Sequence, residues 1–244
     1  PKGIPLIIDN TASPVICKPL AHGAAIVMHS LTNYIGGHGT SIGGIVVDGG
    51  NFDWTKNRKR QPLLNEPDQS YGGAVWIDAV PQLTGANIPF VIRLRVVLLR
   101  DTGAPLAPFN AWQIIQGLET VGLRMKQHCS NAEKVVTFLE TQKKVQNVIY
   151  PTNHQGEIKE RAKKYMQGGY GSLVGMDVGT KENGAKFIDN LKMLYHVANI
   201  GDARSLAIHP ATTTHSQLNE KELLAAGVTP GYVRLSIGIE HPDD

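Results

Sequence analysis

The chain has 244 residues, of which 41% are hydrophobic and 18% are charged, and its formal net charge at pH 7 is +3. This composition is typical of a soluble globular protein with one large or two modest hydrophobic cores. The most basic segment, residues 56–60, has no interleaved aromatic side chains, so it indicates a solvated loop and argues against a nucleic-acid-binding protein.

The cysteines and histidines argue against two further classes of protein. Cys17 and Cys129 lie far apart with no C-x-x-C spacing, which indicates reduced thiols and predicts a cytoplasmic location. The nine histidines include no H-x-x-x-H pair, so no metal site is predicted. No apolar run reaches the length of a membrane-spanning helix, so no membrane partner is predicted.

Three short apolar runs near the start are predicted to be strands of a mostly parallel sheet: residues 6–8, 25–28 and 45–47. The first is expected to be buried on both faces. Asp9 and Thr11 follow the first run, and Ser30 and Thr32 follow the second. Ligands of open α/β sheets bind beyond the carboxyl ends of the strands, so these residues form a candidate site. A later apolar segment, residues 90–99, could be a helix or a strand, and we favour a helix.

Ser30 and Thr32 are two positions apart, so in an extended strand both hydroxyls would point to one side, where a phosphate could bind. Glycines at positions 36, 37 and 39 would let the backbone approach a ligand closely. Two plainer interpretations stay open. The segment could be an ordinary glycine-rich turn between strands, and Asp9 could be a loop cap.

A long helix gives the clearest local signal, because apolar residues recur at helical spacing from Asn110 to about Thr141. Asn110 is predicted to cap this helix with Gln113 at the capping-box position. Phe109 and Ile114 occupy the positions of a hydrophobic staple. A helix of this length is a natural hinge between two domains.

Short strands and helices are predicted after the long helix, at residues 145–150, 172–178, 181–194, 220–226 and 232–237. This mixture indicates an α+β domain, so we predict one domain at residues 1–109 and a second at residues 110–244. Arg234 is the only charged residue of the last strand, and its guanidinium matches a carboxylate in bidentate fashion. A ligand carboxylate and an ion pair with Glu240 or Asp202 explain it equally well.

Several motifs lie along essentially the whole chain: residues 9–11, 19–24, 29–39, 49–54, 99–104, 108–111, 116–120, 201–206, 209–211 and 233–240. In this order they resemble the Cys/Met-metabolism (trans-sulfuration) family of enzymes dependent on pyridoxal 5'-phosphate. Residues 35–39 and 51–54 are more similar to the O-acetylhomoserine sulfhydrylase branch than to the cystathionine enzymes or methionine γ-lyase.

The resemblance implies an α/β cofactor domain of the fold type I class, incomplete in this sequence, followed by an α+β domain. Asp9 would bind the protonated pyridine nitrogen of pyridoxal 5'-phosphate, and Ser30 and Thr32 would bind its phosphate. Arg234 would hold the α-carboxylate of an amino-acid substrate, with Ser205 nearby. The implied reaction is γ-replacement in methionine biosynthesis, in which sulfide displaces acetate from O-acetylhomoserine and homocysteine forms. The family's tetramers imply a homo-oligomer.

One position departs from the family pattern. The catalytic lysine that forms the Schiff base and carries protons should stand between Thr32 and Tyr34, where this chain has Asn33. A carboxamide forms no imine and has no useful basicity. The family's segments before Asp9 and after Asp244 are also expected to be missing. Three interpretations stay open: a longer enzyme with a replaced or modified lysine, one half of a split enzyme, or a catalytically inactive fragment or interaction subunit.

Overall fold

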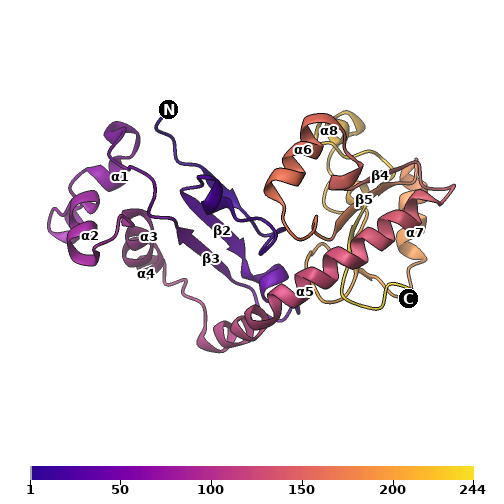
Figure 1. Cartoon of the computed structure of the whole chain (residues 1–244), viewed down its shortest axis with the longest axis horizontal. Helices are drawn as coiled ribbons and strands as arrows, with labels where there is room; N and C mark the ends of the chain where they lie inside the picture. Colours follow the sequence, from indigo (N-terminus) through magenta and orange to yellow (C-terminus); the bar gives the residue numbers. More distant parts are fainter. Residues whose placement is uncertain (1) are drawn as a thin grey trace. The chain divides into compact units, whose positions relative to one another are not determined.

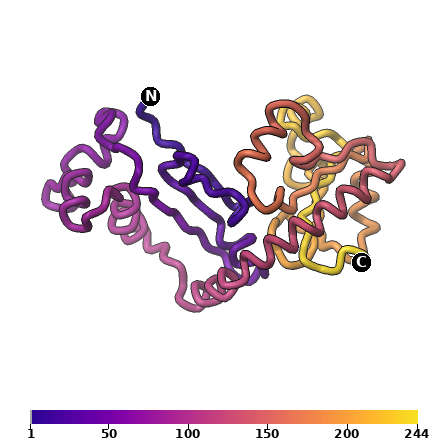
Figure 2. The backbone as a smooth tube through the Cα atoms, in the orientation of Figure 1, coloured from indigo at the N-terminus to yellow at the C-terminus, as the bar shows by residue number. Residues whose placement is uncertain are grey.

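The computed structural model describes residues 2–244, which form two compact units (Figures 1 and 2). The first unit comprises the chain up to residue 10, residues 18–30 and residues 43–111, and the second comprises residues 11–17, 31–42 and 112–244. Two short segments from the N-terminal part of the chain therefore pack with the C-terminal part. The predicted boundary between residues 109 and 110 stays a prediction, although the units do change close to it, within the long helix.

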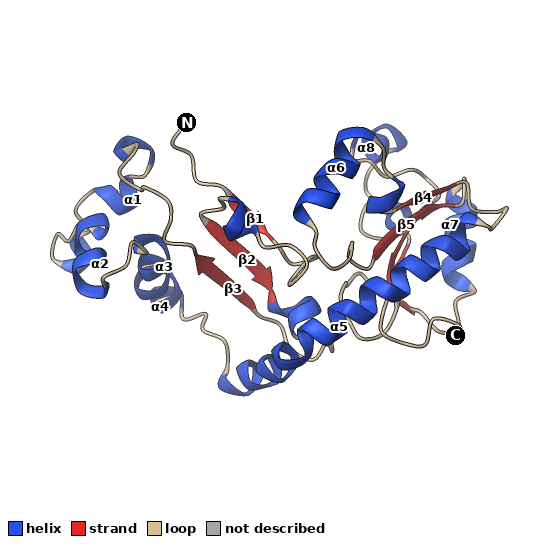
Figure 3. Cartoon of the chain, in the orientation of Figure 1, coloured by secondary structure: helices blue, strands red, loops and turns tan. Residues whose placement is uncertain are grey.

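The first unit contains a three-stranded sheet with the order β1 (Ile7–Asp9), β2 (Ile26–Ser30), β3 (Gly44–Asp48) (Figure 3). β1 runs parallel to β2, whereas β3 runs antiparallel to β2. The sheet is therefore mixed, and the expectation of mostly parallel strands does not extend to β3. A parallel neighbour needs a crossover connection, and residues 31–42 instead leave this unit for the second.

Burial differs between the strands of this sheet. Ile26 and Val27 in the central strand β2 are almost completely buried. The prediction that the first strand is buried on both faces is wrong, because Ile7 is 48% exposed and β1 lies at the edge of the described sheet. An apolar run predicts a strand but does not indicate whether another layer covers it.

The helices and helical turns of the first unit are η1 (Pro19–His22), η3 (Arg58–Arg60), α1 (Pro62–Asn65), η4 (Gln69–Tyr71), α2 (Trp76–Thr84), α3 (Pro89–Arg93), η5 (Leu94–Leu99) and α4 (Arg100–Thr102). The predicted helix at residues 90–99 is thus confirmed. In this helical part, α3 packs against β3 and η1 packs against β2. Ile26 packs in a core with Trp54 and Phe90, whose rings stack at 5.4 Å between centroids.

Within residues 2–244 no single helix is long and apolar enough to cross a membrane. In the same part of the chain only one bent pair, α2 together with residues 89–102, has the length and apolar composition of a membrane-spanning segment.

The second unit is an α+β structure, as predicted. Its five-stranded sheet has the order β4 (Asn147–Ile149), β5 (Leu173–Asp177), β8 (Tyr232–Ser236), β7 (Leu206–Ile208), β6 (Tyr195–His196). The helices and helical turns are η2 (Leu31–Ile35), α5 (Pro108–Glu140), η6 (Pro151–Asn153), α6 (Gly156–Tyr165), α7 (Lys181–Asp189), η7 (Pro210–Thr212) and α8 (Glu220–Ala225). The sheet packs on α5 through a core that includes Val136, Val174 and Val233. β6, β7 and α6 have no counterpart among the predicted elements.

The start of α5 differs from the prediction. The helix begins at Pro108, so Asn110 lies inside the helix and is not its cap. Proline suits the first turn because its missing N–H would have no partner there and its φ is already helical. Phe109 is 65% exposed, so the predicted staple with Ile114 does not form, and Gln113 instead accepts a hydrogen bond from the hydroxyl of Ser41 (2.7 Å).

Two buried polar residues of α5 hold the chain that follows β8, which Figure 2 draws in yellow. Nδ1 of His128 lies 2.7 Å from the carbonyl oxygen of Ile237, which can only accept, so this nitrogen carries the proton. The amide of Asn131 donates to the carbonyls of Gly238 (3.1 Å) and Glu240 (2.7 Å). Nε2 of His128 is buried without a hydrogen-bond partner among residues 2–244.

Burial lowers the pKa of His128 from its ordinary value of 6.5. The imidazole therefore takes up a proton at a higher pH in the unfolded chain than in the folded chain. The contribution of neutral His128 to the free energy of unfolding is complete above pH 6.5 and decreases as the pH falls below that value. We expect the free energy of unfolding to fall below that pH by up to about 1.4 kcal/mol per pH unit. His128→Asn should reduce this slope in urea titrations between acidic and neutral pH. The exposed His196→Asn is the control, and equal slopes for the two variants would contradict the assignment.

Candidate functional site

The predicted lysine position lies on the turn η2, which follows β2 directly. The N–H of Gly36 donates to the carbonyl of Leu31 (2.9 Å), and the N–H of Gly37 donates to the carbonyl of Asn33 (2.7 Å). The first of these bonds spans five residues, which makes η2 a π-type turn interrupted at Asn33, where ψ is −132°. Single π-type turns are frequent at functional sites because they redirect one residue out of the regular helical path.

The carboxamide of Asn33 is fully engaged as a donor. Its Nδ2 donates to Oδ1 of Asn199 (2.7 Å) and to the main-chain oxygen of Ile200 (2.9 Å). An amide nitrogen has two protons, so both are used in these bonds. The side chain at position 33 is therefore fixed beside residues 199 and 200 and offers no nucleophile there.

Arg234 lies near Asn33 through the same neighbour. It stands in the middle of β8, where it pairs with Gly175 of β5 and Ile208 of β7. Its Nη2 donates to the main-chain oxygen of Asn199 (3.2 Å), and its Nε is buried without a hydrogen-bond partner within residues 2–244. The guanidinium thus retains an unused donor close to position 33.

The two carboxylates considered as partners for Arg234 are occupied elsewhere. Glu240 accepts hydrogen bonds from the main-chain N–H and the hydroxyl of Ser205 (2.5 and 2.9 Å). Asp202 pairs with Arg204 at 3.1 Å. Among the described residues no carboxylate forms an ion pair with Arg234, whose side chain is partly buried. Its role in binding a ligand carboxylate stays a prediction.

The hydroxyl of Ser205 links two residues of the chain that follows β8, Gly238 and Glu240. It donates to Glu240 and accepts from the N–H of Gly238 (2.8 Å). The only hydroxyl proton is therefore committed to Glu240, which braces the chain after β8. The predicted role of Ser205 near the substrate stays a prediction.

Asp9 and Ser30 share a face of the sheet in the first unit. Asp9 pairs with Met28, and Ser30 lies two residues further along β2, so their Cα atoms are about 8 Å apart. Burial lowers the pKa of His29, and the carboxyl group of Asp9 opposes that shift, so the two side chains lie near each other. Asp9 is exposed and Ser30 is half-buried.

Thr32 belongs to η2 and to the second unit. The strand geometry that would place its hydroxyl on the same side as that of Ser30 does not apply, because β2 ends at Ser30 and a helical turn follows. The phosphate contacts of Ser30 and Thr32 stay predictions. Sequence reasoning also missed Asn199, for which no spacing or composition signal exists.

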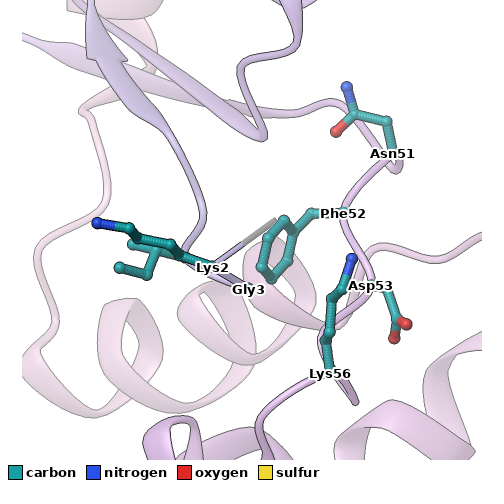
Figure 4. Close-up of a pocket in the computed structure, with 7 residues that line it drawn as sticks. Lys2, Gly3, Asn51, Phe52, Asp53 and Lys56 are labelled. Carbon is teal, nitrogen blue, oxygen red and sulfur yellow. The ribbon is translucent and has the colours of Figure 1, made fainter.

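A surface depression of about 600 Å³ in the first unit contains none of the predicted site residues. Figure 4 shows the ring of Phe52 at its centre with Lys2 and Lys56 on either side. The residues that line it are Lys2, Gly3, Ile4, Asn51, Phe52, Asp53 and Lys56. It includes part of the segment at residues 51–54, but no buried polar group points into it, so it adds nothing to the site.

The residues present fit pyridoxal 5'-phosphate and its substrate in part. Arg234, with its unpaired Nε, fits the carboxylate of an amino acid. Asp9 offers a carboxylate suited to a protonated pyridine nitrogen. Asn33 does not fit the cofactor aldehyde, because an amide already bound to two oxygens forms no imine. Arg234 and Asp9 thus offer groups suited to non-covalent binding, whereas position 33 offers no covalent anchor.

Comparison with known proteins agrees with this chemistry. The chain is 50% identical over 248 residues to the O-acetyl-L-homoserine sulfhydrylase of Leptospira meyeri, covering 99% of this chain and 56% of that protein. It is 40% identical to a Campylobacter jejuni protein named as an O-acetylhomoserine (thiol)-lyase, whose crystal structure contains N'-pyridoxyl-lysine 5'-monophosphate; the TM-score is 0.88, with 99% of this chain and 57% of that one covered. The cystathionine γ-lyase of Lactobacillus plantarum, solved with L-serine, is 28% identical with a TM-score of 0.73, with 98% of this chain and 53% of that one covered.

The chain thus spans little more than half the length of these relatives. The family model for the Cys/Met metabolism PLP-dependent enzymes matches residues 1–244. The match includes the turn that carries Asn33 and the strand that carries Arg234. The chain belongs to the Cys/Met metabolism family of enzymes, whose cofactor is pyridoxal 5'-phosphate.

Proposed function

We propose that this protein serves γ-replacement on O-acetylhomoserine, in which sulfide displaces acetate to give homocysteine. The proposal rests on one geometric observation, that the position of the family's lysine and the guanidinium of Arg234 meet at Asn199. The names of the relatives from Leptospira meyeri and Campylobacter jejuni support the choice of substrate.

Each predicted site residue has a role in this proposal. Arg234 binds the α-carboxylate of the amino acid and so orients the α-carbon toward position 33. Asp9 holds the pyridine nitrogen in its protonated form, while Ser30 and Thr32 bind the phosphate. Pyridoxal 5'-phosphate, when bound, supplies an electron sink for negative charge at the α-carbon. Ser205 keeps Glu240 away from Arg234 by binding it, so the guanidinium stays available for substrate.

Asn33 favours a second candidate function. A side chain that moves no proton cannot perform the α- and β-proton transfers that γ-replacement requires. The alternative is a catalytically inactive subunit that binds the cofactor or a partner chain. The two candidates differ in whether a lysine at position 33 is sufficient to create activity.

We further propose that the protein forms a homo-oligomer, with a tetramer as the expected form. Trp112, Ile115 and Leu118 are spaced by three residues on α5 and are 50 to 55% exposed, so they form an apolar stripe on one face of the helix. Exposed apolar patches of this kind mark interaction surfaces. A cytoplasmic location also stays a prediction, supported by Cys17 and Cys129, which form no disulfide within residues 2–244.

Asn33→Lys should create a covalent cofactor site. With pyridoxal 5'-phosphate we expect a visible imine absorbance band, fixation of the label on residue 33 by borohydride, and homocysteine formation from O-acetylhomoserine and sulfide. The unsubstituted chain should give no label at this position and no product. The exposed Asn147→Lys is the control for labelling of surface lysines. An N33K variant that binds cofactor but forms no homocysteine would favour the inactive subunit.

Arg234→Lys should weaken substrate binding in the N33K chain. Loss of a charged hydrogen bond of this kind typically costs about 1.5–3 kcal/mol, so we expect roughly a ten- to hundred-fold higher Kd for O-acetylhomoserine by calorimetry. The amino alcohol that lacks the carboxylate should bind both forms equally. Arg204→Lys is the matched control, because Arg204 is half-exposed and already paired with Asp202. An equal loss of affinity in both variants would contradict the proposed role.

A further inference from the structure

Arg124 is a buried cation whose partners are all neutral. The residue lies on α5 and is 6% exposed. Its Nη1 donates to the carbonyl of Tyr34 (2.6 Å), and its Nη2 donates to the carbonyls of Ile35 (2.9 Å) and Gly117 (2.6 Å). Its Nε donates to the hydroxyl of Thr120 (3.1 Å). Two of these four acceptors belong to the turn that carries position 33.

No carboxylate compensates this charge. Within residues 2–244 no ion pair involves Arg124, and burial lowers the pKa of its guanidinium. An unpaired buried charge is costly unless dipoles solvate it. The carbonyls of Tyr34 and Ile35 stand at the end of η2, where the negative ends of the peptide dipoles point. The guanidinium and the turn therefore stabilise each other.

Two glycines allow this contact. A Cβ on Gly117 would lie 2.6 Å from the carbonyl oxygen of Ile35 and would also collide with that of Gly36, so only glycine lets α5 approach η2 so closely. Gly37 has φ +75°, and a Cβ there would lie 2.5 Å from Cζ of Arg124. A larger residue at either position would displace the turn or the guanidinium. The backbone of η2 is thus seated on α5 around the Arg124 side chain.

We propose that Arg124 is the positioning residue for position 33, because it binds the carbonyls of Tyr34 and Ile35 in the turn η2 and so fixes the direction of the side chain at that position. This inference rests on the proposed function only in that position 33 is taken to face the cofactor. Arg124 touches neither Asn33 nor Arg234 in any described hydrogen bond. It acts through the backbone of Tyr34 and Ile35 alone.

The first test needs no cofactor and measures amide hydrogen exchange by NMR in the full chain. The amides of Gly36 and Gly37 close η2, so their protection reports whether the turn is held. Arg124→Met should accelerate exchange at these two amides about ten-fold or more, and Arg124→Lys, which retains charge but loses the planar fork, should give an intermediate value.

Val136→Ala is the control for a general loss of stability. Val136 is 4% exposed, lies on the same helix and packs in the sheet core. With urea added to match the stability of R124M, V136A should change exchange at Gly36 and Gly37 less than about two-fold. Equal acceleration in both variants would mean that Arg124 is merely structural and would overturn the proposal.

A second variant keeps the experiment informative if R124M does not fold. Gly117→Ala leaves Arg124 in place but pushes the turn away from α5, so it should accelerate the same two amides. Protection at Gly36 and Gly37 that is unchanged in both G117A and R124K would also overturn the proposal.

The last arm adds pyridoxal 5'-phosphate to N33K and to the double variant N33K/R124K. The double variant should show an imine band with a changed pH profile and about ten-fold weaker cofactor binding, which corresponds to 1.4 kcal/mol. If N33K forms no imine but the exchange results are as expected, the proposed function fails and the positioning role stands. If the two chains share one pH profile and one affinity while the imine forms, the positioning role fails and the proposed function stands.

Discussion

The main-chain and side-chain oxygens of Asn199 hold together the part of the site that lies in the second unit. Its side-chain oxygen accepts a hydrogen bond from the amide of Asn33, and its main-chain oxygen accepts one from the guanidinium of Arg234. One residue therefore holds two groups that are far apart in the sequence. The neighbouring oxygen of Ile200 completes the pair of acceptors around position 33. These two acceptors match the two protons of the asparagine amide.

A single face of α5 supports the segments that surround this residue. Arg124, His128 and Asn131 are spaced by four and three residues, so they share one side of the helix, and each donates to main-chain carbonyls. Arg124 holds the turn η2, whereas His128 and Asn131 hold the chain that follows β8. The helix therefore fixes both the segment with position 33 and the segment next to Arg234. Hydrogen bonds to main-chain carbonyls hold these two segments in place without involving their side chains, so the side chains remain available for other contacts.

Sequence patterns predicted the elements better than the contacts that position the site. The apolar spacing of α5 is visible in the sequence, and Arg124 and His128 fall on its buried stripe at helical spacing from Val121. The spacing does not show which main-chain carbonyls these two polar side chains bind. β6 and β7 have two and three residues, which is too short for an alternating pattern to be recognised. Arg234 was identified because it is the only charge in an apolar strand, and only the structure could show that Glu240 and Asp202 have other partners. Strand alternation could not place the side chain of Thr32, because β2 ends at Ser30 where a helical turn begins, and nothing in the local alternation marks that end.

The arrangement around Arg234 bears on whether the chain retains a ligand site despite Asn33. A buried hydrogen-bond donor without a partner typically costs about 1–3 kcal/mol, and more when the group is charged. Arg93 also has a buried unpaired Nε, but the carboxylate of Asp68 lies 3.8 Å away and compensates its charge. Arg234 has no such carboxylate among the described residues, while Asn33 satisfies both of its own amide protons. A purely structural role gains nothing from this unpaired donor, which supports the proposal that Arg234 binds an anionic ligand.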